Sequence, residues 1–354
     1  MVHALSEFGI WLIVLCVFGF LVLVHEVGHF LIARRMGVRI LRFSIGFGPK
    51  IVGWCRGDTE YWLSWVPLGG YVKMAGEQRT DQPPQPGDYQ EKSVGKRAII
   101  VAAGPAVNYL VAWIVLWVFF MIGYPGVLPV VGEVTDGMPA QEAGLLTGDR
   151  ILAIDARAVR TWDQMTAIIR KSPERAIQLR LKRNGRVLML PIVPISEPVT
   201  GTKATVKTIG LIGIGAGSYR AGPVEALGLS ITTICDWTIQ TLTSLVALVT
   251  RQMSMRETVT GPIGILHLTS EAARVGLGPL LYLTSLFSLS LAIFNVFPIP
   301  ILDGGHLLFL AIEKLRGKPV SPTVQERAAM VSLAVLVSFV LMVSINDLQR
   351  LLHR

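Results

Sequence analysis

Four long apolar runs stand out in the pattern of hydrophobic and polar positions along the chain. They cover residues 8–32, 98–123, 276–302 and 328–345. A helix needs about 20 apolar residues to cross the ~30 Å hydrocarbon core of a bilayer, and all four runs are near or above that length. The pattern therefore predicts a polytopic α-helical membrane protein with four transmembrane helices.

The orientation of these helices follows from the basic residues beside the runs. Lys and Arg cluster between the first two runs, and again between the last two at Lys314, Arg316, Lys318 and Arg327. By the positive-inside rule both of these loops are cytoplasmic, so both termini are expected outside. Arg350 and Arg354 near the end of the chain weigh weakly against this orientation.

The same pattern divides the chain into consecutive segments. We expect transmembrane helices at 1–36, 98–123, 276–303 and 328–345, and cytoplasmic loops at 37–97 and 304–327. On the extracytoplasmic side we expect a compact domain at 124–199 and an amphipathic helical region at 200–275. Within that region 226–250 is almost apolar enough to span, but Asp236 and repeated Ser and Thr favour a helix at the membrane surface or against the spans.

The compact domain alternates short strand-like runs with turn signals. A short helix is expected at 162–171, and Asn184-Gly185 predicts a hairpin turn. The pattern PAxxAGLxxGDxIxxI at 139–154 resembles the PDZ domains of bacterial proteases. We therefore expect one extracytoplasmic PDZ-like α+β domain, which would bind an extended peptide at a sheet edge. A generic small α+β domain is the alternative.

Residues 43–76 form an unusual stretch in the first cytoplasmic loop. The stretch is rich in glycine and aromatic residues, alternates in a strand-like way, and is too apolar for an ordinary loop. Backbone outside helices is tolerated at membrane depth only where it is buried in protein or lines a water-filled cavity. We expect a membrane-associated β element here.

Composition agrees with a membrane protein. The chain is 51% hydrophobic and only 16% charged, whereas soluble domains carry about 25% charged residues. The net charge of +9 lies largely beside apolar runs, so we assign it to loops facing an anionic leaflet and expect no nucleic-acid partner. Cys16, Cys55 and Cys235 lie far apart, which argues against a disulfide framework and against a thiolate metal site.

The candidate chemistry lies inside the first run. His25, Glu26 and His29 form the pattern HExxH, in which two histidines four residues apart share one face of a helix and can reach one metal ion. Ionisable groups within a span are costly, so three of them together favour a functional site over a solvated charged turn. Glu26, beside the histidines, is placed to take a proton from a water molecule acidified by the metal.

A catalytic zinc ion normally takes three protein ligands, so a third is needed. Asp303, within NVFPIPILDGGH, is the candidate: Pro298 and Pro300 interrupt the helix before it, and two glycines after it allow close backbone approach. The first and third spans run in the same direction only if the segment between the second and third spans contains no further crossing, which gives four crossings in all. Asp303, at the end of the third span, then lies at the depth of the histidines. A simple helix cap is the alternative role for Asp303, and His306 is a rival ligand.

Two other functional classes remain compatible with parts of this pattern. A membrane-anchored PDZ adaptor with a non-catalytic core would have no need of Glu26. A divalent-metal transporter would carry several polar residues in each span, whereas the second and fourth runs have almost none.

Taken in order, HEVGHF at 25–30, AGPAVN at 103–108, one PDZ-like domain and NVFPIPILDGGH at 295–306 resemble the site-2 protease family. The likeness is greatest to the bacterial RseP-type intramembrane zinc metalloproteases and spans nearly the whole chain. It implies that His25, His29 and Asp303 bind Zn²⁺, that Glu26 is the general base, and that Asn295 contacts the substrate or its oxyanion. It also implies that 43–76 is a membrane-reentrant β element that presents the substrate as an added strand.

The resemblance further implies what the protein acts on and where. Members cleave single-span membrane proteins within or near the membrane, typically anti-sigma factors and signal-peptide remnants, in the bacterial inner membrane. The PDZ domain would face the extracytoplasmic side and bind a peptide there. One departure matters: the best-known enterobacterial member has two tandem PDZ domains, and this chain has the motif once, so substrate screening by a tandem pair does not carry over.

Overall fold

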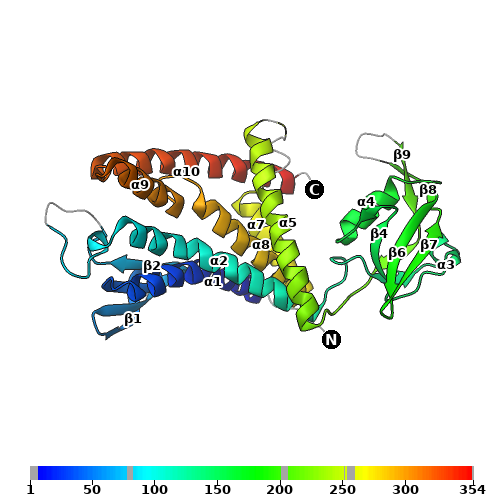
Figure 1. The fold of residues 1–354 in the computed structure, drawn as a ribbon, viewed down its shortest axis with the longest axis horizontal. Coiled ribbons are helices and arrows are strands. Elements are labelled where there is room, and N and C mark those ends of the chain that lie inside the picture. The colour runs from blue at the N-terminus through cyan, green and yellow to red at the C-terminus, as the bar shows by residue number, and fades with distance from the viewer. Residues whose placement is uncertain (1–6, 78–82, 201–205, 251, 253–259, 353–354) are drawn as a thin grey trace. The chain divides into compact units, whose positions relative to one another are not determined.

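The protein divides into two compact units, which are described separately here (Figure 1). A computed structural model describes residues 7–77, 83–200, 206–250, 252 and 260–352. One unit combines the chain up to Leu116 with the chain from Leu229 onward, and the other is Trp117–Gly228.

Four helices in the described residues are long and apolar enough to cross a membrane. They are α1 (Glu7–Arg35), α2 (Val94–Ile122), α8 (Leu277–Val296) and α10 (Pro322–Leu352). The prediction of a polytopic helical membrane protein with four transmembrane helices is confirmed.

Two predicted boundaries on the C-terminal side were wrong. The run at 276–302 is not one helix, because α8 ends at Val296 and the two prolines that follow keep 297–302 out of helical structure. A separate helix, α9 (Asp303–Arg316), fills most of the expected loop at 304–327. Asp303 therefore opens α9 and is not the end of the third transmembrane helix.

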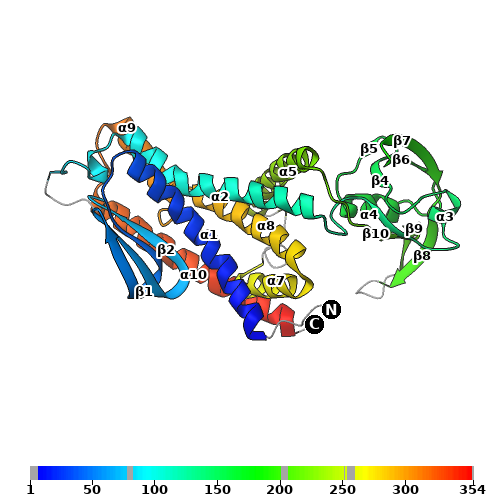
Figure 2. The ribbon, with the colours of Figure 1, turned by 90° about the horizontal axis from the view of Figure 1, so that it is seen from below.

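The expected β element is present as a long hairpin beside α1 (Figure 2). It consists of β1 (Ile40–Arg56) and β2 (Thr59–Met74). The start of β1 is paired on both sides, because residues 42–45 lie beside 60–63 and also beside 70–73. In the described part of the chain, residues 70–74 pair on one side only, which leaves the end of β2 as an edge strand.

The second unit contains the PDZ-like domain. Its four-stranded sheet has the order β5-β4-β6-β7 and packs with α4 (Trp162–Arg170). The strands are β4 (Arg150–Ile154), β5 (Arg157–Ala158), β6 (Ile177–Arg183) and β7 (Arg186–Ile192). Asn184 and Gly185 join β6 to β7 with φ angles of 49° and 83°, the left-handed values of the predicted tight hairpin turn.

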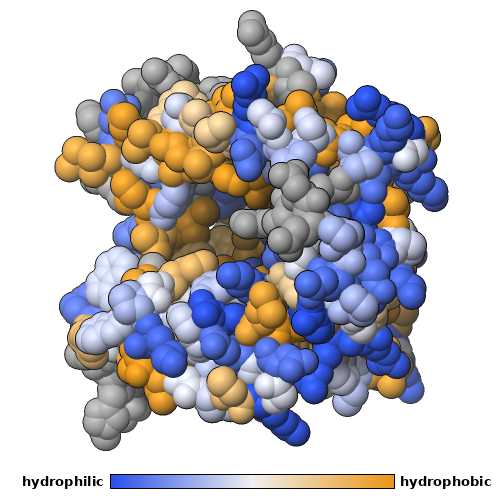
Figure 3. Space-filling view, turned by 90° about the vertical axis from the view of Figure 1, so that its left-hand side faces the viewer, coloured by the Kyte–Doolittle hydropathy of each residue, from blue (hydrophilic) through white to orange (hydrophobic). Residues whose placement is uncertain are grey.

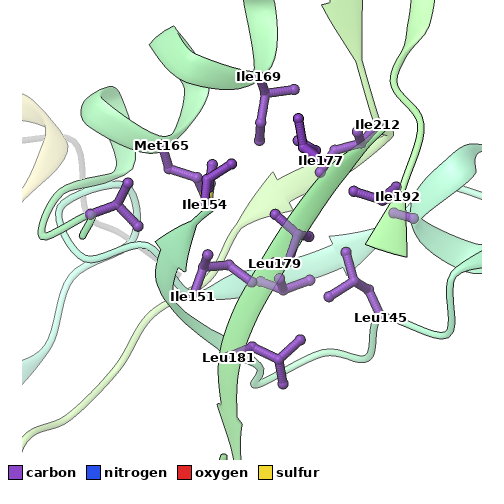
Figure 4. Packing of buried hydrophobic residues seen from close by; sticks show 13 residues of the cluster. Leu145, Ile151, Ile154, Met165, Ile169, Ile177, Leu179, Leu181, Ile192 and Ile212 are labelled. Carbon is purple, nitrogen blue, oxygen red and sulfur yellow. The ribbon is translucent and has the colours of Figure 1, made fainter. Parts of the chain in front are cut away.

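The core of this domain explains its strand pattern. Ile177, Leu179 and Leu181 alternate inward along β6 and are buried together with Ile151, Ile154, Met165 and Ile169 (Figure 4). Ile212, from well beyond the predicted end of the domain, completes this core.

The predicted end of the PDZ-like domain at residue 199 was therefore too early. The pairs that close the fold are β3 (Val131–Val134) with β10 (Ile214–Ala216), and β8 (Ile195–Thr200) with β9 (Val206–Leu211). A short helix, α3 (Pro139–Glu142), carries the PAxxAG motif. The helical region at 200–275 accordingly begins only with α5 (Pro223–Val249) and continues with α7 (Pro262–Val275).

Candidate metal centre

The centre begins with the face that α1 turns toward α2. His25 and His29 lie one turn apart, with their rings edge to face and their centroids 4.8 Å apart. Both side chains are largely buried in an apolar helix, and both lie beside the carboxylate of Asp303. The HExxH spacing thus places two nitrogen donors at one point of the helix surface.

Two glycines let α1 and α2 approach closely at this point. A Cβ atom on Gly28 would clash with the carbonyl of Ala103, and one on Gly104 would clash with the rings of His29 and His25. Only residues without a side chain fit at these two positions. The glycine of the AGP sequence in α2 is therefore required by the packing against the histidines.

Asp303 reaches the same point from α9. A Cβ atom on Gly304 would collide with the carbonyl oxygens of Val296 and Phe297, and one on Gly305 with that of Ile299. The two glycines thus let the first turn of α9 pack directly on the non-helical segment before it. This packing turns the Asp303 carboxylate back toward α1.

The distances among the three side chains fit a tetrahedral ion. His25 Nε2 lies 3.2 Å from His29 Nε2 and 3.0 Å from Asp303 Oδ2, and His29 Nε2 lies 3.5 Å from the same oxygen. Ligands at zinc bond lengths of about 2.0–2.2 Å and tetrahedral angles are separated by about 3.3–3.6 Å. Within the described residues, the buried Asp303 Oδ2 has no polar partner other than these two imidazoles. The donor set of two imidazoles and one carboxylate is one that zinc accepts and leaves a fourth position open.

The surroundings orient the members of this cluster. His29 Nδ1 lies 2.9 Å from the carbonyl oxygen of Ile100, so the proton resides on Nδ1 and the lone pair of Nε2 points to the cluster. The backbone N–H of Val72 faces the carboxylate of Glu26, and β2 packs along α1. The edge of β2 and the helix that carries HExxH are thus in direct contact.

A cavity of about 340 Å³ adjoins the cluster. His25, Glu26, His29 and Asp303 form one part of its wall, and β2, α2 and α9 provide much of the rest. The molecular face formed by these elements is visibly hollowed, with hydrophobic side chains in its depth (Figure 3). The cavity gives water and an extended peptide room to reach the cluster.

A buried ion pair at the far side of this cavity holds α9 to α2. The guanidinium of Arg97, which is only 5% exposed, donates hydrogen bonds of 2.6 and 3.2 Å to the two carboxylate oxygens of Glu313. Glu313 lies near the end of α9, the helix that Asp303 begins. The pair therefore fixes the helix whose first residue is the candidate third ligand.

The other residues singled out in the sequence lie around this cluster. His306 lines the cavity, but the group of potential ligands in the described residues consists of His25, His29 and Asp303. Asn295 is half-buried in the last turn of α8 and is not among the residues that line the cavity, so its role stays a prediction.

One residue near the cluster was missed. Asn108, wholly buried in α2, has its amide nitrogen 3.4 Å from His25 Nδ1. It belongs to the AGPAVN motif, which carried the family resemblance but was given no role.

Comparison with known proteins identifies the family. The profile of peptidase family M50 matches residues 13–339. The chain belongs to peptidase family M50. The resemblance to the site-2 proteases is thereby confirmed, and the M50 protein is a zinc metallopeptidase of the site-2 class. The adaptor and transporter alternatives are set aside.

Relatives of this M50 protein match it over almost their whole length. A Rhizobium meliloti protein is 37% identical, covering 93% of each chain. The regulator of sigma-E protease RseP of Escherichia coli is 31% identical over 94% of this chain and 97% of its own. The regulator of sigma-W protease RasP of Bacillus subtilis is 30% identical over 95% of this chain and 97% of its own.

Among solved structures, the PDZ domain of an SdrC-like protein from Listeria monocytogenes is 24% identical. The match covers 26% of this chain and 88% of that domain, with a TM-score of 0.20.

Proposed function

We propose that this M50 peptidase hydrolyses peptide bonds within or near the transmembrane segments of single-span proteins in a bacterial inner membrane. The observation that carries the proposal is the convergence of Asp303, from α9, on two histidines that lie beside Glu26 in an apolar span. Groups of this kind are costly in a membrane unless they act together on something at that depth. The names of the relatives, regulators of sigma-E and sigma-W proteases, support substrates of the anti-sigma-factor type, with signal-peptide remnants as a second class.

In the proposed mechanism His25, His29 and Asp303 hold Zn²⁺. When bound, the ion supplies a Lewis acid that polarises the scissile carbonyl and acidifies a water molecule. Glu26 takes the proton of the attacking water on a carboxylate oxygen and passes it to the leaving amine. The carbonyl of Ile100 holds His29 in the tautomer that this arrangement needs.

We propose that the substrate enters as a strand along the free edge of β2 at 70–74. The N–H groups of Val72 and Met74 point to this edge. That of Val72 faces the Glu26 carboxylate, and that of Met74 donates to Glu77, a bond that an added strand would replace. Alternate N–H groups of an edge strand are the donors that an added strand uses. Because a helix occupies its carbonyls with its own hydrogen bonds, the substrate helix must unwind before it can pair here.

The remaining roles follow from the family motif and the charge pattern. Asn295 is proposed to contact the unwound substrate near the reacting carbonyl. The PDZ-like domain and both termini are proposed to be extracytoplasmic, with a peptide as the ligand of the domain. The single PDZ-like domain regulates access and takes no part in the chemistry.

The test is cleavage of a model single-span protein by purified full-length chain in nanodiscs. Cleavage by wild type should stop on addition of a zinc chelator and return when Zn²⁺ is restored. Glu26→Gln, which preserves size and removes the base, should be inactive. Cleavage that survives both chelation and Glu26→Gln would exclude this mechanism.

A further inference from the structure

One face of α2 lies against both histidines of the HExxH motif. Its residues are Ile100, Gly104 and Asn108, spaced one turn apart. The carbonyl of Ile100 accepts from His29 Nδ1, and Gly104 leaves room for both rings. Asn108 is the next position on this face, 3.4 Å from His25 Nδ1. Each histidine thus has its Nδ1 atom opposite a different residue of the same helix face.

The amide of Asn108 presents its nitrogen, a donor, to a histidine nitrogen that is also a donor. A histidine that offers Nε2 to a metal carries its proton on Nδ1, so His25 Nδ1 is a donor. The amide nitrogen of Asn108, also a donor, faces it, while the buried Oδ1 of Asn108 has no hydrogen-bond partner in the part of the chain that the structure describes. The oxygen and nitrogen of an amide are nearly equal in shape, and their assignment follows from the hydrogen bonds. Exchanging them places an acceptor opposite the His25 donor and gives the orphaned oxygen its partner.

We propose that Asn108 is a positioning residue for the metal centre. Its Oδ1 accepts a hydrogen bond from His25 Nδ1–H and fixes the tautomer and the ring angle at which Nε2 meets Zn²⁺. This inference rests on the proposed function, which makes His25 a ligand. Asn108 would thus orient His25 in the same way as the carbonyl of Ile100 orients His29.

The backbone around Asn108 is held by other groups. Ser288 Oγ donates to the carbonyl of Asn108 at 2.8 Å, and Ser285 Oγ donates to the carbonyl of Ala112 at 2.6 Å. Both serines belong to α8 and are fully buried. These two bonds join α2 to α8 through main-chain atoms, so the side chain of Asn108 is not needed for that purpose. Its amide is left to serve His25.

The test uses purified full-length protein and measures zinc affinity by competition with a chromogenic chelator. Asn108→Leu keeps the branching at Cγ and removes the acceptor, whereas Asn108→Asp keeps an acceptor oxygen in the same place. Loss of a hydrogen bond to a metal-binding histidine typically lowers metal affinity 10–100-fold. We expect that loss in Asn108→Leu and an affinity close to wild type in Asn108→Asp.

A matched control separates positioning from packing. Ser285→Ala removes a buried bond between α2 and α8 but touches no ligand, so it should lower the melting temperature and leave zinc affinity unchanged. The visible spectrum of the Co²⁺-substituted protein, which reports ligand geometry, should change in Asn108→Leu and not in Ser285→Ala. Asn108→Ala also removes the acceptor but adds no large apolar side chain, and the same change in zinc affinity and Co²⁺ spectrum is expected for it.

Each outcome decides a different question. Wild-type zinc affinity and an unchanged Co²⁺ spectrum in Asn108→Leu or Asn108→Ala would overturn the positioning role. Equal loss in Asn108→Asp and Asn108→Leu would also overturn it, because the acceptor would then be irrelevant. Absence of zinc binding by the wild-type protein would instead refute the proposed function itself.

Discussion

At the scale of single residues, the proposed roles assign metal binding and proton transfer to different groups. Asp303, His25 and His29 direct their donor atoms at one point, whereas the Glu26 carboxylate faces the edge of β2. Removing a ligand and removing the base should therefore have different consequences, which makes the two roles separable by experiment.

Glu26→Gln is expected to retain one zinc ion per chain and to lose cleavage. The amide keeps the size of the carboxylate but cannot accept the water proton, and loss of a general base typically costs 10²–10⁴ in rate. Zinc content by elemental analysis and single-turnover cleavage should be measured on the same preparation. Normal turnover in this variant would remove Glu26 from the mechanism.

Asp303→Ala is expected to lose the metal. Two histidines alone leave a catalytic zinc site one ligand short, so zinc content should fall well below one per chain after dialysis. His306→Ala is the matched control, because His306 lines the same cavity outside the ligand group. Full zinc in Asp303→Ala with loss in His306→Ala would reverse the assignment.

The residue scale also shows how far the sequence predicts the centre. The histidines follow from helical spacing, and Asp303 follows from the prolines and glycines beside it, since both signals are local. Asn108 could not be found in this way, because its contact joins residues 83 positions apart and depends on how α1 and α2 pack. A buried amide inside an apolar run is the only local signal for it.

At the scale of elements, α9 is held at both of its ends. Its first turn packs on the non-helical segment after α8, and Glu313 near its end is paired with Arg97 of α2. The position of the candidate third ligand thus depends on a charge pair at the opposite end of the helix.

Arg97→Met should destabilise the protein strongly, because it leaves Glu313 partly buried without its main cation. Breaking one partner of a buried pair typically costs about 3–5 kcal/mol, whereas replacing both partners by apolar residues is often nearly neutral. The melting temperature should therefore fall in Arg97→Met and recover in Arg97→Met/Glu313→Met. A double variant as unstable as the single one would show that the pair itself, and not the unpaired charge, sets the stability.

Two element boundaries explain what the sequence pattern missed. The end of α8 lies within an uninterrupted apolar run, and hydropathy alone does not register the change at Val296 from helix to a proline-rich turn. The strand β10 is only three residues long and pairs with β3, more than seventy positions earlier, so no local period marks it. The hairpin at Asn184-Gly185 was predictable because its signal is contained in two residues.

At the scale of the whole molecule, orientation in the membrane can be tested directly. On a background without Cys16, Cys55 and Cys235, a cysteine at Arg186 should react with an impermeant reagent from outside. A cysteine at Lys318 should react only from the cytoplasm, because the positive-inside rule places that loop there. Both positions are exposed, so burial does not confound the labelling. Labelling of both from one side would contradict four crossings with external termini.

Removing the PDZ-like domain is the second test at this scale. The main chain enters and leaves the domain side by side, since the N–H of Ala221 donates to the carbonyl of Phe120 at 3.0 Å. Deleting 124–221 with a short Gly-Ser linker also removes β8, β9 and β10, which a shorter deletion would leave without their partners. We expect retained zinc, undiminished cleavage of a minimal span, and faster cleavage of substrates with bulky ectodomains. Loss of all cleavage in a zinc-loaded deletion would show that the domain is needed for the chemistry.

The one-sided pairing of β2 has a consequence for what this protease can distinguish. An edge strand offers the same N–H and C=O groups to every peptide, because the main chain carries no sequence information. The choice among substrates would then depend on how readily a segment of the substrate helix, at the depth of the metal centre, loses its own helical hydrogen bonds. Glycine and proline cost a helix about 1 and 3 kcal/mol per residue, so a few such residues alter the population of the extended form by orders of magnitude. The cleavage site would accordingly be set by the weakest turn of the substrate helix, and two spans with no side chain in common could be cut equally well.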